Sequence, residues 1–197
     1  MSITTWAVRK DGRPELGKTC FILVSGKIGA GKTTFSRYLS DTLTSYGYVT
    51  IEKSFADALK EAATFYFNWD GRKEDNGRKL LQGLGNLGRE YDEDLWANTL
   101  VNDVREIGVL DFVIVDDWRF QNELNVIRNN TQFDLITVRI FRDNAAIKNS
   151  KELLDDVSET SLSESPDDYD FDIYNLGSME DLQKMVNQFT ETILEVK

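Results

Sequence analysis

The sequence has no histidine and only one cysteine, Cys20, among its 197 residues. Without histidine the chain cannot build the Ser-His-Asp or Cys-His arrangements of nucleophilic catalysis, and it cannot hold a metal through imidazole. A lone cysteine makes no disulfide within the chain. Because Cys20 lies in an apolar run, we expect its side chain to be buried like that of a small hydrophobic residue. The lack of disulfides makes the reducing cytoplasm the expected location of the protein. Any bound metal should then be a hard ion with oxygen ligands, which points to Mg²⁺.

Long apolar runs and excess positive charge are also missing. No apolar run is long enough to cross a bilayer, and residues 1–18 lack the apolar centre of a signal peptide. The chain has 23 Lys and Arg against 34 Asp and Glu, so its formal net charge is −11. This charge disfavours nucleic acids and anionic membranes as partners. A small phosphorylated substrate remains compatible with it if arginine side chains gather in a cleft.

Residues 26–33 read Gly-Lys-Ile-Gly-Ala-Gly-Lys-Thr and match the phosphate-binding pattern G-x-x-x-x-G-K-[ST]. An apolar run at 20–24 precedes them and apolar residues at helical spacing follow, which is the strand–loop–helix context that the pattern requires. Glycine lets such a loop wrap around phosphate oxygens. We expect Lys32 to reach the β- and γ-phosphates of ATP and Thr33 to hold Mg²⁺. The residues expected to bind ATP here are Gly26, Ile28, Gly29, Ala30, Gly31, Lys32, Thr33 and Thr34.

Strands and helices alternate along the rest of the chain, which predicts a parallel sheet covered on both faces. The fold class is therefore α/β: a three-layer, doubly wound parallel sheet of about five strands, of the P-loop kinase type. Residues 19–197 form one domain, and residues 1–18 form an N-terminal arm or an added edge strand. The expected strands are 19–25, 48–51, 112–115, 135–141 and 171–174. The expected helices are 31–46, most of 54–108 and an amphipathic helix at the C-terminus.

Asp116 and Asp117 follow the apolar strand 112–115 directly. In a doubly wound sheet the end of such a strand lies beside the phosphate-binding loop, where P-loop enzymes keep the carboxylate that organises Mg²⁺. The sequence does not decide which of the two faces the metal. Arg119 is close enough to them to face the same cleft and to clamp a phosphate through two hydrogen bonds. A surface salt bridge is the alternative role for Arg119.

Short characteristic blocks follow the loop along the chain. They are Phe-Ala-Asp-Ala-Leu-Lys at 55–60, Trp-Asp-Gly at 69–71, Gly-Arg-Lys-Leu-Leu-Gln-Gly-Leu-Gly at 77–85, Asp-Trp-Arg-Phe-Gln-Asn-Glu at 117–123, Val-Ser-Glu at 157–159 and Asp-Ile-Tyr-Asn-Leu-Gly at 172–177. In this order they resemble the phage-type deoxynucleoside monophosphate kinases. Val157 departs from that family, which often has histidine before the Ser-Glu pair. A viral origin would place the protein in the host cytoplasm.

Transfer between two phosphorylated molecules requires several converging positive side chains. Outside the loop the candidates are Lys60, Arg72, Arg78, Arg89, Arg119, Arg139 and Arg142. The resemblance implies that the helical region 54–108 binds the acceptor, with Asp57, Arg78, Gln82 and Arg119 in the site and Lys60, Trp69 and Arg89 beside them. Arg78 and Gln82 are four residues apart, so they share one helix face. Gln82 either reads a base edge through its amide or is a solvated helix residue.

Two further segments take their expected roles from the resemblance. Arg142 follows the fourth strand, where related kinases begin a closing lid, here at about 142–165, and it would bridge the donor and acceptor phosphates. A basic patch neutralised by the acidic stretch that follows is the alternative. Asn175 and Gly177 resemble the loop that lies against the base of ATP, although Asn-x-Gly is also a common turn.

The function expected is Mg²⁺-dependent transfer of the γ-phosphate from ATP to a (deoxy)nucleoside 5′-monophosphate, which gives the diphosphate. The expected catalytic residues are Lys32, Asp117, Arg119 and Arg142, and the expected metal-binding residues are Thr33, Asp116 and Asp117. The alternatives are another small-molecule P-loop kinase, such as one acting on a coenzyme precursor, and a non-catalytic ATP-binding sensor. The partners expected are nucleotide substrates, and a homodimer is left open.

We expect Lys32→Ala to abolish turnover and to leave the fold intact, because the substitution removes the positive charge that holds the donor phosphates. ADP release measured beside a thermal melting curve tests this. A variant with unchanged melting and full activity would count against a P-loop kinase.

Overall fold

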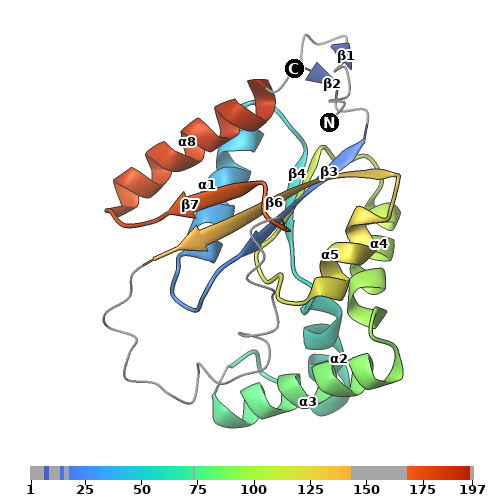
Figure 1. Cartoon of the computed structure of the whole chain (residues 1–197). Coiled ribbons are helices and arrows are strands. Elements are labelled where there is room, and N and C mark those ends of the chain that lie inside the picture. The colour runs from blue at the N-terminus through green and yellow to red at the C-terminus, as the bar shows by residue number, and fades with distance from the viewer. Residues whose placement is uncertain (1–6, 9–13, 16–17, 73, 143–167, 196–197) are drawn as a thin grey trace.

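Figure 1 shows the computed structural model of the chain, which describes residues 7–8, 14–15, 18–72, 74–142 and 168–195. Its central sheet has five parallel strands in the order β4-β5-β3-β6-β7. This order is 2-3-1-4-5 when the strands of the sheet are counted along the chain. The elements are β1 (Ala7–Val8), β2 (Pro14–Glu15), β3 (Thr19–Ser25), α1 (Lys32–Ser45), β4 (Thr50–Lys53), α2 (Asp57–Phe67), α3 (Asp75–Tyr91), α4 (Leu95–Ile107), β5 (Phe112–Val115), α5 (Gln121–Arg128), β6 (Phe133–Phe141), β7 (Phe171–Tyr174) and α8 (Met179–Glu195).

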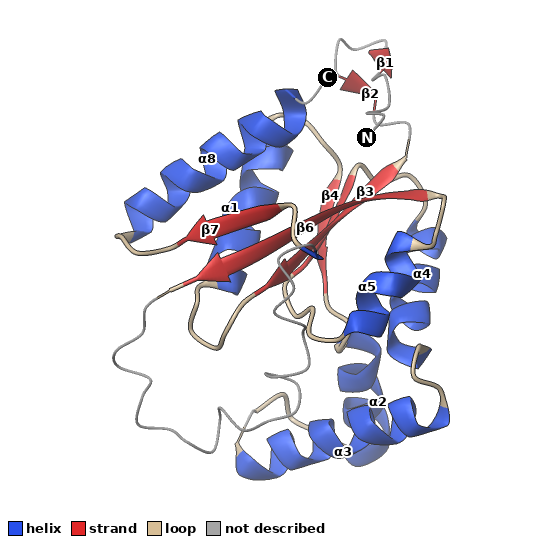
Figure 2. Cartoon of the chain, viewed as in Figure 1, coloured by secondary structure: helices blue, strands red, loops and turns tan. Residues whose placement is uncertain are grey.

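Helices cover both faces of the sheet, so the fold has three layers (Figure 2). The cluster of buried side chains under α1 and α8 includes Cys20, Ile22 and Val24 of β3. The cluster under α4 and α5 includes the alternate residues Phe21 and Leu23. A strand buried on both faces has to be apolar throughout, as β3 is. The predicted doubly wound α/β fold of the P-loop kinase type is confirmed, and so is the burial of Cys20.

The second sheet strand begins two residues later than predicted. The prediction was 48–51, whereas β4 is Thr50–Lys53. The N–H of Tyr48 donates to the carbonyl of Leu43 in α1, and Val49 bonds to the backbone of Asp111 before β5 begins. The backbone groups of residues 48 and 49 therefore bond to the end of α1 and to the loop before β5, and the pairing of β4 with β5 starts only after them.

Helix α5 is an element that the sequence analysis did not predict. It is short, and its N-terminus is fixed by Glu123, whose carboxylate accepts the N–H of Phe120 at 3.0 Å. Buried Leu124 and Ile127 form its inner face. A glutamate three residues after a helix start, followed by apolar residues three apart, is the signal that could have identified it.

The N-terminal segment contributes a small sheet of its own. β1 and β2 pair antiparallel with each other, with Ala7 opposite Glu15, and the described strands of the larger sheet include neither of them. Within the described residues, every helix is too short or too polar to cross a membrane.

The carboxyl ends of the parallel strands lie at one edge of the sheet. β5 runs between β3 and β4, with Val115 paired to Leu23 on one side and to Lys53 on the other. α2 and α3 lie beyond this edge (Figure 1). The phosphate-binding loop, the acidic pair after β5 and the start of α2 are therefore neighbours, because each follows the end of an adjacent strand.

Leu39→Ala should lower the free energy of unfolding by about 2–5 kcal/mol, because it leaves a cavity where α1 packs on the sheet. Leu39 is fully buried in the cluster under α1 and α8. Val109→Ala is the matched control: its side chain is 84% exposed, and its effect should stay within about 0.5 kcal/mol. Urea denaturation measures both. Equal effects would mean that this face of the sheet is not the core described here.

Candidate active site

The phosphate-binding loop joins β3 to α1 and is held close to its neighbours. Gly26 has a φ of +146°, and its Cα lies against the carbonyl of Ile140 in β6, where a side chain would not fit. Gly31 has a φ of +98° and directly precedes the first residue of α1. Only glycine adopts these conformations without strain. The loop thus ends at the N-terminus of α1, where the N–H groups of a first helical turn and the helix dipole favour a phosphate.

Lys32 and Thr33 begin α1 and have different partners. The ammonium of Lys32 donates to the carbonyls of Gly26 at 2.6 Å and Lys27 at 3.2 Å, so it lies across the loop. The hydroxyl of Thr33 donates to the carboxylate of Asp116, with 2.6 Å between Oγ1 and Oδ2. A hydroxyl and a carboxylate side by side are oxygen donors of the kind that Mg²⁺ prefers.

The carboxylate of Asp117 is directed to the turn between β4 and α2. It accepts hydrogen bonds from the Ser54 hydroxyl at 2.6 Å and from the N–H groups of Phe55 at 2.9 Å and Ala56 at 3.2 Å. Burial raises the pKa of Asp117, and these hydrogen bonds act against the rise. The metal-binding and catalytic roles expected of Asp117 stay predictions. Its oxygens are committed to the turn, and Asp116 is the carboxylate beside Thr33.

Two predicted acceptor residues extend the same network. Asp57 accepts the N–H of Ser54 at 2.8 Å and forms an ion pair of 2.9 Å with Lys60. The ammonium of Lys60 also lies 3.2 Å from the Ser54 hydroxyl. Ser54, which the sequence analysis did not single out, thus connects Asp57 and Lys60 to Asp117. The start of α2 is fixed to the end of β5 in this way.

Two predicted arginines meet at the loop that enters α5. Glu123 is 6% exposed, and its Oε2 accepts the backbone N–H groups of Arg119 at 2.9 Å and Phe120 at 3.0 Å. The guanidinium of Arg89 in α3 stacks over the ring of Phe120 at 4.4 Å. The backbone of Arg119 and the side chain of Arg89 are therefore held at one loop.

Glu123 is a second residue of the candidate site that the sequence analysis did not single out. Burial raises its pKa to about 8, and the nearby charge of Asp117 adds to the rise. The N–H groups of Arg119 and Phe120 and the positive charge of Arg89 act in the opposite direction. The carboxyl group is therefore protonated at neutral pH for much of the time.

The remaining acceptor candidates lie on α3 or just before it. Arg78 and Gln82 are both exposed, one turn apart on α3, as their spacing predicts. The indole N–H of Trp69 donates to the carbonyl of Arg72 at 2.9 Å. Gly77 lies against both groups, and a side chain there would clash with them. Trp69 therefore holds the turn before α3, and its polar atom is already used.

Two arginines at the end of β6 have different surroundings. Arg139 is paired with Asp172 of β7 through Nε and Nη2, each at 3.0 Å, so its charge is balanced within the sheet. Arg142 is exposed directly after β6. The predicted lid lies outside the described residues beyond Arg142, and so does the Val-Ser-Glu block at 157–159.

Asn175 and Gly177 follow β7, and Asn175 reaches back to the phosphate-binding loop. Its amide donates to the carbonyl of Ala30 at 2.9 Å, and only 2% of the residue is exposed. Gly177 lies against Asp181, whose carboxylate accepts the N–H of Ser178 at 2.9 Å before α8 begins. The Asn-x-Gly segment therefore contacts the loop and leads into a helix. One N–H of the Asn175 amide is engaged by the loop, and its expected contact with the base of ATP stays a prediction.

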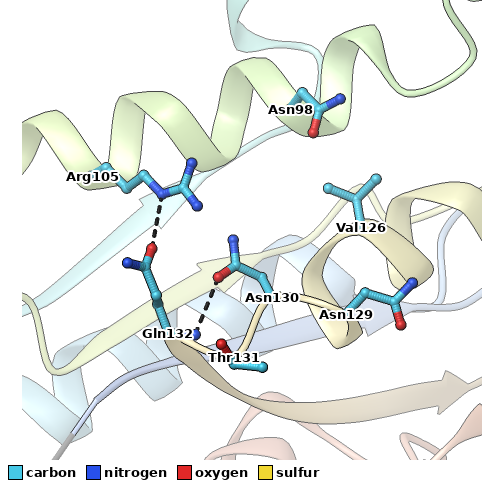
Figure 3. A pocket seen from close by; sticks show the side chains of 7 residues that line it. All are labelled: Asn98, Arg105, Val126, Asn129, Asn130, Thr131 and Gln132. Carbon is cyan, nitrogen blue, oxygen red and sulfur yellow. Dashed lines mark hydrogen bonds between the residues drawn. The ribbon is translucent and has the colours of Figure 1, made fainter.

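A separate groove of about 560 Å³ is lined by other residues. Figure 3 shows its lining, in which Arg105 donates to Gln132 at 3.2 Å. Gln132 directly precedes β6, so the groove is at the amino end of the strands. It contains none of the predicted site residues: its lining is Asn98, Arg105, Val126, Asn129, Asn130, Thr131 and Gln132.

The sheet order and the loop define the class of the fold, which is the P-loop kinase-like α/β fold. Solved structures share it at low sequence identity. The protein APE1195 has 13% identity and a TM-score of 0.53, with 91% of this chain and 99% of that chain covered. Dephospho-CoA kinase from Campylobacter jejuni has 16% identity and a TM-score of 0.50, with 90% and 98% covered. No protein-family model and no curated protein sequence matches the chain.

Glu123→Gln should remove a pH dependence of stability, because glutamine accepts the same N–H groups without titrating. The pKa of Glu123 is raised from 4.5 to about 8, so the folded protein keeps a proton that the unfolded chain loses. This contribution to stability is complete below pH 4.5 and is lost as the pH rises through about 8. Relative to the variant, the wild type should lose up to about 1.4 kcal/mol per pH unit in this range.

Urea denaturation of both proteins at several pH values between 5 and 8 measures the difference. Parallel profiles for the wild type and the variant would show that Glu123 is ionised in the folded protein over the whole range.

Proposed function

We propose that the chain is a Mg²⁺-dependent nucleoside monophosphate kinase that transfers the γ-phosphate of ATP to a deoxynucleoside 5′-monophosphate. One observation carries the proposal. At the end of β5, Asp116 lies 2.6 Å from the hydroxyl of Thr33, and Asp117 lies 2.6 Å from the hydroxyl of Ser54. Adjacent residues thus join the phosphate-binding loop to the helical region that the resemblance assigns to the acceptor.

The donor side follows from the loop. Its N–H groups and the ammonium of Lys32 would hold the β- and γ-phosphates. Thr33 and Asp116 would hold Mg²⁺, which when bound neutralises charge on the phosphates. The described residues contain no cluster of three acidic or thiol groups, so ATP and water would have to supply the other ligands.

The transfer needs no protein nucleophile, because the acceptor phosphate is itself an anion. One of its oxygens attacks the γ-phosphorus in line, the bond between this phosphorus and the β–γ bridging oxygen breaks, and ADP leaves with that oxygen. The protein contributes by position and charge. Lys32 stays with the phosphates throughout, and Arg142 would reach them from the end of β6.

The acceptor would lie between the start of α2 and the loop that enters α5. Arg119 is held there by Glu123, and Arg89 is stacked on the neighbouring Phe120. Guanidinium groups suit a phosphate because they offer paired donors in one plane. Arg78 and Gln82 on the exposed face of α3 would contact the sugar or base.

Two other functions remain as alternatives. Another small-molecule kinase is the first, since dephospho-CoA kinase from Campylobacter jejuni shares the fold. A non-catalytic ATP sensor is the second, because a phosphate-binding loop by itself implies that ATP is bound and not that its phosphate is transferred. The three functions differ in which acceptor, if any, stimulates the release of ADP.

A panel of acceptors tests the proposed function. With ATP and Mg²⁺, we expect ADP release to be stimulated by one or more of the four deoxynucleoside monophosphates and not by nucleosides or dephospho-CoA. The ribonucleotide counterparts are included to measure the discrimination at the sugar. Lys32→Ala protein purified in the same way controls for contaminating kinases. Turnover on a non-nucleotide acceptor would favour the first alternative, and tight ATP binding without any stimulated release would favour the sensor.

A further inference from the structure

The contact between Asn175 and the phosphate-binding loop joins segments that are far apart in the sequence. The Asn175 Nδ2 donates to the carbonyl of Ala30 at 2.9 Å inside the protein. Both residues are 2% exposed. The backbone of Asn175 is fixed as well, because its N–H donates to the carbonyl of Phe141 at 2.8 Å. A carbonyl can only accept, so the amide must present its NH₂ group to Ala30.

This bond sets the direction of the next N–H group in the loop. The peptide between Ala30 and Gly31 is planar and trans, since the described chain has no cis peptide bonds. Its C=O and N–H therefore point in opposite directions. With the Ala30 carbonyl held toward the Asn175 amide, the N–H of Gly31 points away from that amide.

We propose that Asn175 is a positioning residue that directs the Gly31 N–H toward the donor phosphates by holding the Ala30 carbonyl. The proposal rests on the proposed function only in taking the loop as the ATP site. It differs from the role implied by the resemblance, in which Asn175 lies against the base of ATP.

The packing around Gly31 supports this role. A Cβ on Gly31 would lie 2.5 Å from the Asn175 Nδ2, and the φ of Gly31 is +98°. Asn175 therefore occupies the space beside the loop that a side chain at 31 would need. Asn175 is almost completely buried, so little water can reach its amide to replace Ala30 as the partner.

Inorganic tripolyphosphate separates positioning from base contact, because it has the phosphates of ATP and no base. For Asn175→Asp, which has the same shape but offers a carboxylate to the Ala30 carbonyl, we expect Kd to rise about tenfold or more for both Mg²⁺-tripolyphosphate and Mg²⁺-ATP. The fold-increase in Kd should be the same for the two ligands. Calorimetry on the purified full chain measures both, and the KM of the acceptor at saturating ATP should not change.

Two further variants keep the test valid if Asn175→Asp folds poorly. Asn175→Ala removes the donor without adding charge and should weaken both ligands by equal, smaller factors. Thr190→Val is the control for lost buried hydrogen bonds, because the Thr190 hydroxyl donates to Val186 at 2.8 Å within α8. It should lower the melting temperature at most and leave both Kd values unchanged.

The results distinguish the possibilities. A weaker Kd for ATP with unchanged tripolyphosphate binding would overturn the proposal in favour of a base contact, and unchanged binding of both would overturn it outright. Equal weakening without any acceptor-stimulated ADP release would support the role of Asn175 and count against the proposed kinase function. Acceptor-stimulated ADP release together with unchanged ligand binding in the variants would support the kinase function and count against the role of Asn175.

Discussion

The position of β5 between β3 and β4 is the constraint on which the candidate site depends. Parallel pairing brings the ends of all three strands to one edge, so the residues after β5 lie between the phosphate-binding loop and the start of α2. Successive side chains of an extended chain point in opposite directions. Asp116 accordingly reaches Thr33 on one side, and Asp117 reaches Ser54 on the other. One pair of acidic residues thus links the phosphate-binding loop to the start of α2.

Two carboxyl groups, a half-buried one of Asp117 and a buried one of Glu123, hold the backbone on the far side of Asp116 from the phosphate-binding loop. Asp117 holds the turn before α2, and Glu123 holds the backbone at Arg119. Each accepts backbone N–H groups, which recovers part of the cost of removing a carboxylate from water. Arg119 and Lys60 are therefore carried by segments whose backbone is fixed, whereas their charged groups lie closer to the surface. Such an arrangement favours positioning of an anion over strong internal ion pairs.

The phosphate-binding loop is held from two directions. Gly26 lies against the backbone of Ile140 in β6, and Ala30 is bonded to Asn175 after β7. Both contacts come from strands on the side of β3 opposite to β5. The loop is thus supported by one half of the sheet, while the carboxylate beside it comes from the other half. This division agrees with the rule that ligands of doubly wound sheets bind where the strand order reverses.

The sequence by itself determined the fold class, the five sheet strands, the phosphate-binding loop and the proximity of the acidic pair to it. Apolar periodicity and the motif are local patterns, and such patterns persist in any environment. The boundary of β4, the helix α5, the partners of Asp116 and Asp117, and the contacts of Ser54, Glu123 and Asn175 were decided only by the tertiary structure. Each depends on a contact between residues distant in the chain, such as Asn175 with Ala30, and the composition of either segment carries no record of the other.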